Sequence, residues 1–143
     1  MRAVLLDTGP VVGLVYRADP HRTGSAAAVR ASAARGRAIC TTWEVVGEAY
    51  TLLRMRIAPS RAAAAMQVLR WAWGSSVTIL GADEDDHQRA AHLLEEYSEQ
   101  RMSYVDALTL AIAERHRVEE VLTVDGDHFP TVRLDPSPTI TVV

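Results

Sequence analysis

The first apolar run of the chain ends at a charged residue, and this junction constrains the fold more than any other feature. Residues 3–6 read Ala-Val-Leu-Leu, and Asp7 follows them directly. A continuous apolar run of this length is typical of a strand that is buried on both faces, as strands are in parallel sheets. Pro10 suits the first turn of a helix, where its missing N–H leaves no hydrogen bond unmade. The sequence therefore predicts a buried strand that turns into a helix, with Asp7 at the junction.

The same order of strand and helix recurs along the chain. Further strands are predicted over residues 38–41, 77–80, 120–124 and 139–143. Helices are predicted over residues 23–35, 43–57 and 103–117. Another is predicted from an N-cap at Ser60 to residue 73, and a long acidic helix is predicted to begin with the acidic run 83–86. Strands that alternate with helices indicate an α/β fold with a mainly parallel sheet. At 143 residues the chain is expected to form a single domain, residues 1–143.

The composition is that of a soluble globular protein, with 48% hydrophobic and 23% charged residues. The single cysteine, Cys40, cannot form an intramolecular disulfide, which fits a reducing compartment. No segment approaches the roughly 20 apolar residues that a membrane helix needs. We therefore expect a cytoplasmic protein with no membrane partner.

The charges are unevenly distributed, and all 15 basic residues are arginine. Residues 1–70 contain ten arginines and four acids, a net charge of +6, whereas residues 71–143 contain five arginines and 14 acids, a net charge of −9. A GC-rich genome is the simplest reason for the absence of lysine. Guanidinium groups also bind phosphate in forked geometry, so the basic half could follow a nucleic-acid backbone.

Four carboxylates stand in apolar settings. Asp7 and Asp125 follow predicted strands, and Glu48 and Asp106 lie within apolar helical stretches. Such groups are rarely buried unless they are paired, protonated or bound to a cation. Sites in parallel sheets form beyond the C-terminal ends of the strands. Four acids from four elements therefore indicate one shared cation that prefers oxygen ligands, Mg²⁺ or Mn²⁺.

Each acid also has a purely structural interpretation. Asp7 precedes Thr-Gly-Pro and could belong to a turn or cap a helix. Ser103 and Asp106 fit the capping-box spacing, so Asp106 could serve only to fix the start of its helix. The acidic run 83–86 is interpreted as a solvated helix start, which the helix dipole favours.

Two of the four acids have a competitor nearby. Thr41 and Glu44 fit the capping-box spacing, which leaves Glu48, one turn later on the same helix face, as the preferred site residue. Asp127 competes with Asp125, because both lie in the turn before His-Phe. From the residues alone, either aspartate could take the position at the end of the strand.

Other kinds of site fit the sequence less well. His87 and His92 are five residues apart and have no cysteine partner, which argues against zinc. Without lysine, no P-loop is possible. An aspartyl phosphotransferase typically needs a second aspartate two residues after the first and a lysine near the phosphate, and here that position is Gly9.

The chain resembles the PIN-domain ribonucleases and, among them, the VapC-type toxins of toxin–antitoxin pairs. The matching segments appear in order over nearly the whole length: LLDTGP at residues 5–10, Asp-Pro-His at 19–21, TTWEVVGEAYTLLR at 41–54, MSYVDALTLA at 102–111 and LTVDGDHF at 122–129. The resemblance implies an α/β/α sandwich around a mainly parallel sheet of about five strands. It also implies Mg²⁺- or Mn²⁺-dependent hydrolysis of RNA, a small antitoxin that blocks the nuclease, and a homodimer.

The resemblance assigns roles to particular residues. The acids that match the family's catalytic set are Asp7, Glu48, Asp106 and Asp125. The first and third are expected to bind the metal directly, and the other two directly or through water. Thr8 and Thr123 match hydroxyl positions beside the metal, and Asp127 is a supporting candidate.

Two further functions remain open at the level of sequence. The chain could be a PIN-like binding module that has lost catalysis, which a metal-dependent nuclease assay would reveal. Alternatively, the nuclease could process RNA rather than act as a toxin. Growth arrest on expression, relieved by the adjacent upstream gene, would separate these two roles.

Overall fold

The computed structural model describes every residue except 57 and 58. The strands are β1 (Ala3–Leu6), β2 (Ala38–Thr41), β3 (Thr78–Ile79), β4 (Glu120–Thr123) and β5 (Thr139–Val142). The helices are α1 (Thr8–Val15), α2 (Arg22–Ala34), α3 (Trp43–Arg54), α4 (Pro59–Ala72), α5 (Glu84–Glu96) and α6 (Tyr104–Arg115), with a short 3₁₀ helix at Phe129–Thr131. In the part of the chain that is described, no helix has the length and apolar character that crossing a membrane requires.

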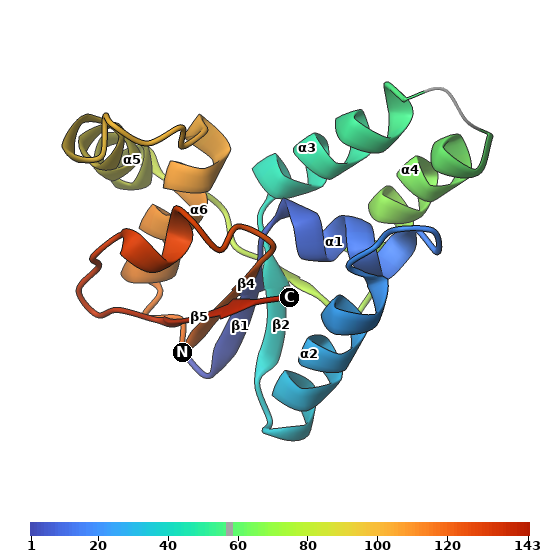
Figure 1. Ribbon diagram of the computed structural model, residues 1–143. Helices are drawn as coiled ribbons and strands as arrows, with labels where there is room; N and C mark the ends of the chain where they lie inside the picture. Colours follow the sequence, from blue (N-terminus) through green and yellow to red (C-terminus); the bar gives the residue numbers. More distant parts are fainter. Residues whose placement is uncertain (57–58) are drawn as a thin grey trace.

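The five strands form one parallel sheet in the order β3-β2-β1-β4-β5 (Figure 1). Strand β1 is central, and all four of its residues are fully buried. Ala3 and Leu5 pack against α5 and α6, whereas Val4 and Leu6 pack into the core formed with α1, α3 and α4. Helices thus cover both faces of the sheet, which explains the continuous apolar run of β1 and confirms the predicted α/β/α architecture.

Several predicted boundaries differ from the structure, most of them by one or two residues; strand β3, for example, is only Thr78–Ile79 where residues 77–80 were predicted. Helix α3 ends at Arg54, and the predicted end at residue 57 lies outside the described residues. Ser60 does not cap α4, because that helix already begins at Pro59, and proline is favoured in the first turn, where its missing N–H has no partner to lose. Helix α6 ends at Arg115 rather than residue 117.

The start of α3 is capped by a different threonine from the predicted one. The Thr42 hydroxyl accepts a hydrogen bond from the Val45 N–H at 3.1 Å, whereas the Thr41 hydroxyl donates to the Leu6 carbonyl at 3.0 Å. Thr41 is the last residue of β2 and is fully buried beside β1, so its hydroxyl satisfies a carbonyl at the end of that strand. The predicted capping box of Thr41 and Glu44 is therefore wrong.

The acidic start of α5 is only partly solvated, as Asp86 shows. Asp83 and Asp86 form a reciprocal capping box, but the Asp86 side chain is only 2% exposed. It accepts hydrogen bonds from Arg115 Nε at 2.8 Å and Arg115 Nη2 at 2.7 Å. The interpretation of this run as a solvated helix start is wrong for Asp86, because an arginine of α6 compensates its buried charge.

Candidate metal-binding site

An open pocket of about 310 Å³ lies at the edge of the sheet where β1 and β4 end. Residues of α1, α3 and α6 and of the segment after β4 line it. The acidic residues of its lining are Asp7, Asp19, Glu48, Asp106 and Asp125. The structure therefore brings the four predicted acids to one pocket, with a fifth that the prediction did not include.

Asp7 is the most buried of these acids, with 5% of its surface exposed. It occupies the N-cap position of α1, but its side chain makes no capping hydrogen bond. Oδ2 accepts a hydrogen bond from the Thr123 hydroxyl at 2.9 Å, while the buried Oδ1 has no partner among the described residues. Burial, followed by the negative charges of Asp106 and Glu48, raises the pKa of Asp7 to about 7. A cation beside Oδ1 would satisfy both the oxygen and the charge.

Threonines position the carboxylates on either side of β1. The Thr8 hydroxyl donates to Glu48 Oε2 at 2.9 Å and so joins the start of α1 to α3. The Thr123 hydroxyl, which donates to Asp7, also accepts the N–H of Asp125 at 3.0 Å. Both hydroxyls thus restrict the rotamers of the acids at the pocket.

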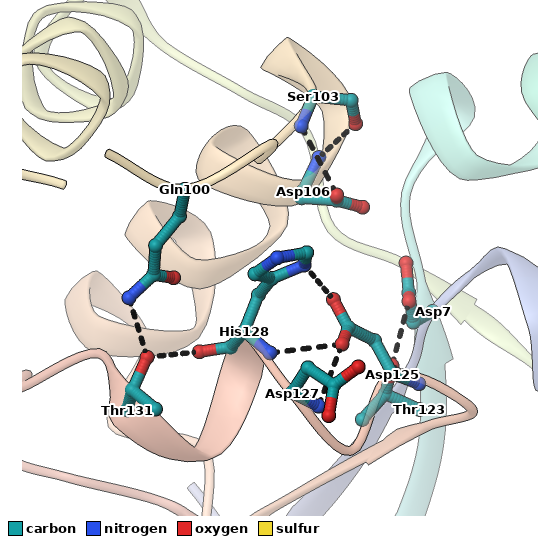
Figure 2. A network of polar contacts seen from close by, with 9 residues as sticks. All are labelled: Asp7, Gln100, Ser103, Asp106, Thr123, Asp125, Asp127, His128 and Thr131. Carbon is teal, nitrogen blue, oxygen red and sulfur yellow. Dashed lines mark hydrogen bonds and ion pairs between the residues drawn. The ribbon is translucent and has the colours of Figure 1, made fainter. Parts of the chain in front are cut away.

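Asp106 combines a structural role with a position in the pocket. Its Oδ2 accepts the Ser103 N–H at 3.1 Å, and its own N–H donates to the Ser103 hydroxyl at 3.1 Å (Figure 2). The capping-box interpretation is therefore correct, yet it occupies only one carboxylate oxygen. Burial, with a contribution from the charge of Asp125, raises the pKa of Asp106.

Asp125 is held by its own turn. Its Oδ1 accepts the N–H groups of Asp127 and His128, both at 2.9 Å, and its Oδ2 lies 2.9 Å from His128 Nδ1 (Figure 2). Burial opposes ionisation, but these N–H groups and the imidazole together lower the pKa of Asp125. Asp127 is exposed and does not line the pocket; its backbone N–H supports Asp125.

Three residues near the pocket were not among the predicted site residues. Asp19 and His21 line it from the turn after α1, where Asp19 Oδ1 accepts the His21 N–H at 2.9 Å. His128 borders it through Asp125. A histidine three residues after an aspartate can fold back over the turn, and this spacing was the signal available for His128. Asp19 and His21 belong to the Asp-Pro-His segment that matches the family, but that match assigned them no role, and the packing of α1 places their turn at the pocket.

Gly9 sets how closely the two walls of the pocket approach. A Cβ at this position would lie 2.4 Å from Val124 Cγ2 and 2.7 Å from Val124 Cγ1. Val124 directly precedes Asp125, and both line the pocket. The first turn of α1 therefore packs against the end of β4 at a distance that only glycine allows.

The donor set suits a hard divalent cation held partly through water. In the residues that the structure describes, no three side chains of Asp, Glu, His or Cys lie close enough together to enclose an ion by themselves. Mg²⁺ typically keeps several of its waters, so carboxylates spread around an open pocket can hold it through them. Burial is the main cause of the raised pKa values of Asp7 and Asp106, and nearby carboxylates add to it. A cation at the unpartnered Oδ1 of Asp7 would offset both causes.

Comparisons with known proteins agree with this architecture. The chain is 25% identical to Ribonuclease VapC26 of Mycobacterium tuberculosis over 130 residues, which cover 91% of this chain and 92% of that protein. The crystal structure of M. tuberculosis VapC20, described as a Sarcin-Ricin loop cleaving toxin, superposes with a TM-score of 0.75 at 22% identity, over 87% of this chain and 92% of the other. VapBC2 from Rickettsia felis, bound to a DNA fragment from its promoter, superposes with a TM-score of 0.70 at 12% identity, over 99% and 98%. The PIN domain family matches residues 4–133, and the chain therefore belongs to the PIN-domain family.

Proposed function

We propose that this protein is a Mg²⁺- or Mn²⁺-dependent endoribonuclease and the toxin of a toxin–antitoxin pair. The observation that supports it most directly is Asp7, whose buried Oδ1 has no partner in the described structure and whose pKa is raised to about 7 beside Asp106 and Glu48. Membership of the PIN-domain family and the similarity to a relative named a ribonuclease support the choice of RNA as substrate.

Some side chains of the pocket would bind the ion, and others hold those ligands in position. Asp7 and Asp106 would bind the ion directly, and Glu48 and Asp125 directly or through water. When bound, such an ion neutralises the phosphate and lowers the pKa of a water molecule toward that of a nucleophile. Thr8 holds Glu48 in place.

The partners follow from the same similarity. The solved structures similar in fold include VapBC complexes and a toxin–antitoxin complex from Klebsiella pneumoniae with a TM-score of 0.65. They support a small antitoxin that binds this chain and blocks cleavage. We further propose a homodimer that acts on cytoplasmic RNA.

A cleavage assay tests the enzymatic part of the proposal. Purified protein is incubated with labelled single-stranded RNA and EDTA, Mg²⁺ or Mn²⁺. Cleavage is expected with either ion and not with EDTA. Asp7→Asn should reduce the rate by about a thousandfold, because it removes a ligand charge at nearly constant shape. Asp127→Asn is the matched control, since Asp127 is exposed and does not line the pocket.

The outcomes separate the competing functions. RNA binding without cleavage under either ion would favour a PIN-like binding module instead. Full activity in Asp7→Asn would overturn the assignment of the site. Expression in bacteria with and without the adjacent upstream gene tests the toxin role: growth arrest relieved by that gene supports it, and unaffected growth supports a role in RNA processing.

A further inference from the structure

A second pocket, of about 420 Å³, gathers three arginines on another part of the surface. Arg17 and Arg22 reach it from the turn after α1 and from the start of α2, and Arg70 reaches it from α4. Gln67 and Trp71 complete its polar wall. No aspartate or glutamate of the described residues lines this arginine pocket.

The three guanidinium groups are not used in ion pairs. Arg22 Nη1 donates to the Leu14 carbonyl at 2.9 Å, which fixes its side chain at the end of α1 and leaves its other N–H groups available. Arg70 Nη1 lies 3.4 Å from Gln67 Oε1, and Arg17 is exposed. In the described structure none of the three is paired with a carboxylate.

The hydrogen bond from Arg22 to the Leu14 carbonyl caps the end of α1 and uses one N–H of one arginine. It does not explain why three arginines line the same pocket. Like charges in one pocket repel each other, and an anion between them would relieve that repulsion. Guanidinium groups match phosphate oxygens with paired N–H donors. The pocket is therefore suited to a phosphate group.

Helix α1 connects the arginine pocket to the acidic pocket. Thr8 at its start lines the acidic pocket, and Leu14 near its end lines the arginine pocket. Six residues of helix separate the two by about 9 Å. The turn after α1 directs Asp19 and His21 to the acidic pocket and Arg17 to the other. Figure 1 shows α1, this turn and α4 side by side.

The acidic pocket alone cannot hold a polyanion. A cation held there would neutralise the phosphate at the cleaved bond only. The five carboxylates repel the rest of the strand, so affinity for its other phosphates has to come from basic groups outside the pocket. The arginine pocket is a basic site at the opposite end of the helix that begins at Asp7 and Thr8. An RNA strand that places one phosphate at the carboxylates can cross the turn and reach it.

We propose that Arg17, Arg22 and Arg70 bind a backbone phosphate of the RNA substrate away from the bond that is cleaved. This inference rests on the proposed function for the identity of the nucleic acid. The contact is to the backbone, so it supplies affinity that is independent of base sequence. The site is a binding subsite and takes no part in the chemistry.

The test measures RNA binding in chains that also contain Asp7→Asn, so that the RNA stays intact. A fluorescent single-stranded RNA of about 12 nucleotides is titrated at several salt concentrations with Mg²⁺ held constant. The test variant is Arg17→Gln with Arg70→Gln, which spares the capping hydrogen bond of Arg22. The control, Arg30→Gln with Arg133→Gln, removes the same charge from exposed positions outside both pockets. Circular dichroism melting checks that all variants fold.

The test variant should raise Kd about fivefold or more at about 150 mM salt, with the control close to the parent. The slope of log K against log salt should become shallower by about 0.7 for each phosphate that the variant no longer neutralises. Equal effects in both double variants, or no RNA binding by the parent, would overturn the subsite. Unchanged RNA binding with weakened binding of a poly-glutamate peptide would assign the pocket to a protein partner and also overturn it.

Failure of the proposed function gives a different result. If the wild-type chain cleaves no RNA with either ion, but the test variant alone loses RNA affinity, the subsite stands and the nuclease assignment falls. If the wild-type chain cleaves RNA and the test variant binds RNA as tightly as the control does, the nuclease assignment stands and the subsite falls.

Discussion

Helices α5 and α6 begin with the same capping motif, but the aspartate that completes the motif has different neighbours in the two helices. Asp83 with Asp86 opens α5, and Ser103 with Asp106 opens α6, each through reciprocal backbone hydrogen bonds. Burial opposes ionisation of both Asp86 and Asp106. Arg115 lowers the pKa of Asp86. At Asp106 the hydrogen bonds of Ser103 and the charge of His128 do not outweigh burial, no arginine of the described residues is paired with it, and its pKa is raised. The same motif therefore serves stability in one helix and borders a charged pocket in the other, and neighbouring charges decide which.

Removing the guanidinium of Arg115, which pairs with Asp86 of the α5 motif, should have the largest effect on stability. In Arg115→Met, the carboxylate of Asp86 stays buried without its partner, which should lower the free energy of unfolding by about 3 kcal/mol. The value is at the low end for buried pairs because the guanidinium is 36% exposed. Urea unfolding measures it, with Arg133→Met as the control. Equal stability of the two variants would show that Asp86 does not depend on Arg115.

The pH dependence of stability should have opposite signs in the neighbourhoods of the two motifs. Asp7, beside Asp106, has a folded-state pKa of about 7 against an ordinary value of 3.8, so the folded protein binds this proton more tightly than the unfolded chain. That stabilisation is complete at low pH and is lost as the pH rises through 7. Between about pH 5 and about pH 8, metal-free protein should lose about 2 kcal/mol from this group.

Asp7→Asn should remove that loss and leave a flatter curve of unfolding free energy against pH. Asp86 contributes the other sign: its lowered pKa gives stability that disappears only as the pH falls below its usual range. A metal-free protein whose stability is constant from about pH 5 to about pH 8 would contradict the raised pKa of Asp7.

Stabilisation by a divalent cation should depend on Asp106 of the α6 motif and not on Asp86 of the α5 motif. At about ten times its dissociation constant, Mg²⁺ or Mn²⁺ should stabilise the wild type by about 1.4 kcal/mol. Asp106→Asn should lose most of this gain, and Asp86→Asn should keep it despite its lower baseline stability. Thermal melting with and without the ion measures both. If the ion stabilised Asp106→Asn and Asp86→Asn equally, it would not be binding in the acidic pocket.

The smallest effects should come from the caps themselves. Ser103→Ala and Asp83→Ala each remove one N-cap and should each cost about 1 kcal/mol of unfolding free energy. Only Ser103→Ala should also slow RNA cleavage, because Ser103 orients Asp106. Equal cleavage rates in the two variants would show that the α6 cap has no influence on the site.

The sequence was sufficient for the parts of the fold that local patterns determine. The apolar run of β1 identified a doubly buried strand. Gly36, which follows the end of α2 with a φ of +75°, is the kind of residue that local patterns place after a helix. The sequence also singled out the four acids, because a carboxylate in an apolar stretch is costly to bury unless it is paired or bound to a cation. The order of strands could not be read from it, since pairing depends on contacts between distant segments.

The errors have a common physical origin. Spacing favoured Thr41 as the cap because Glu44 follows it by three residues. The proximity of β1 instead directs the Thr41 hydroxyl to the Leu6 carbonyl and leaves Thr42 to cap α3. Asp86 looked solvated because its partner, Arg115, is 29 residues away. Asp19 reached the pocket through the packing of a turn. Each depends on a tertiary contact that no local pattern encodes.

The contact between Gly9 and Val124 has a consequence for how this site can change. Because a single methyl group at position 9 would collide with Val124, the separation of the first helix from the loop of Asp125 is adjustable at a residue that contributes no charge. A larger side chain there would force the two walls apart while every carboxylate stayed in the sequence. The dimensions of the pocket, and with them the size of the ligand it can admit, can thus vary independently of its charge.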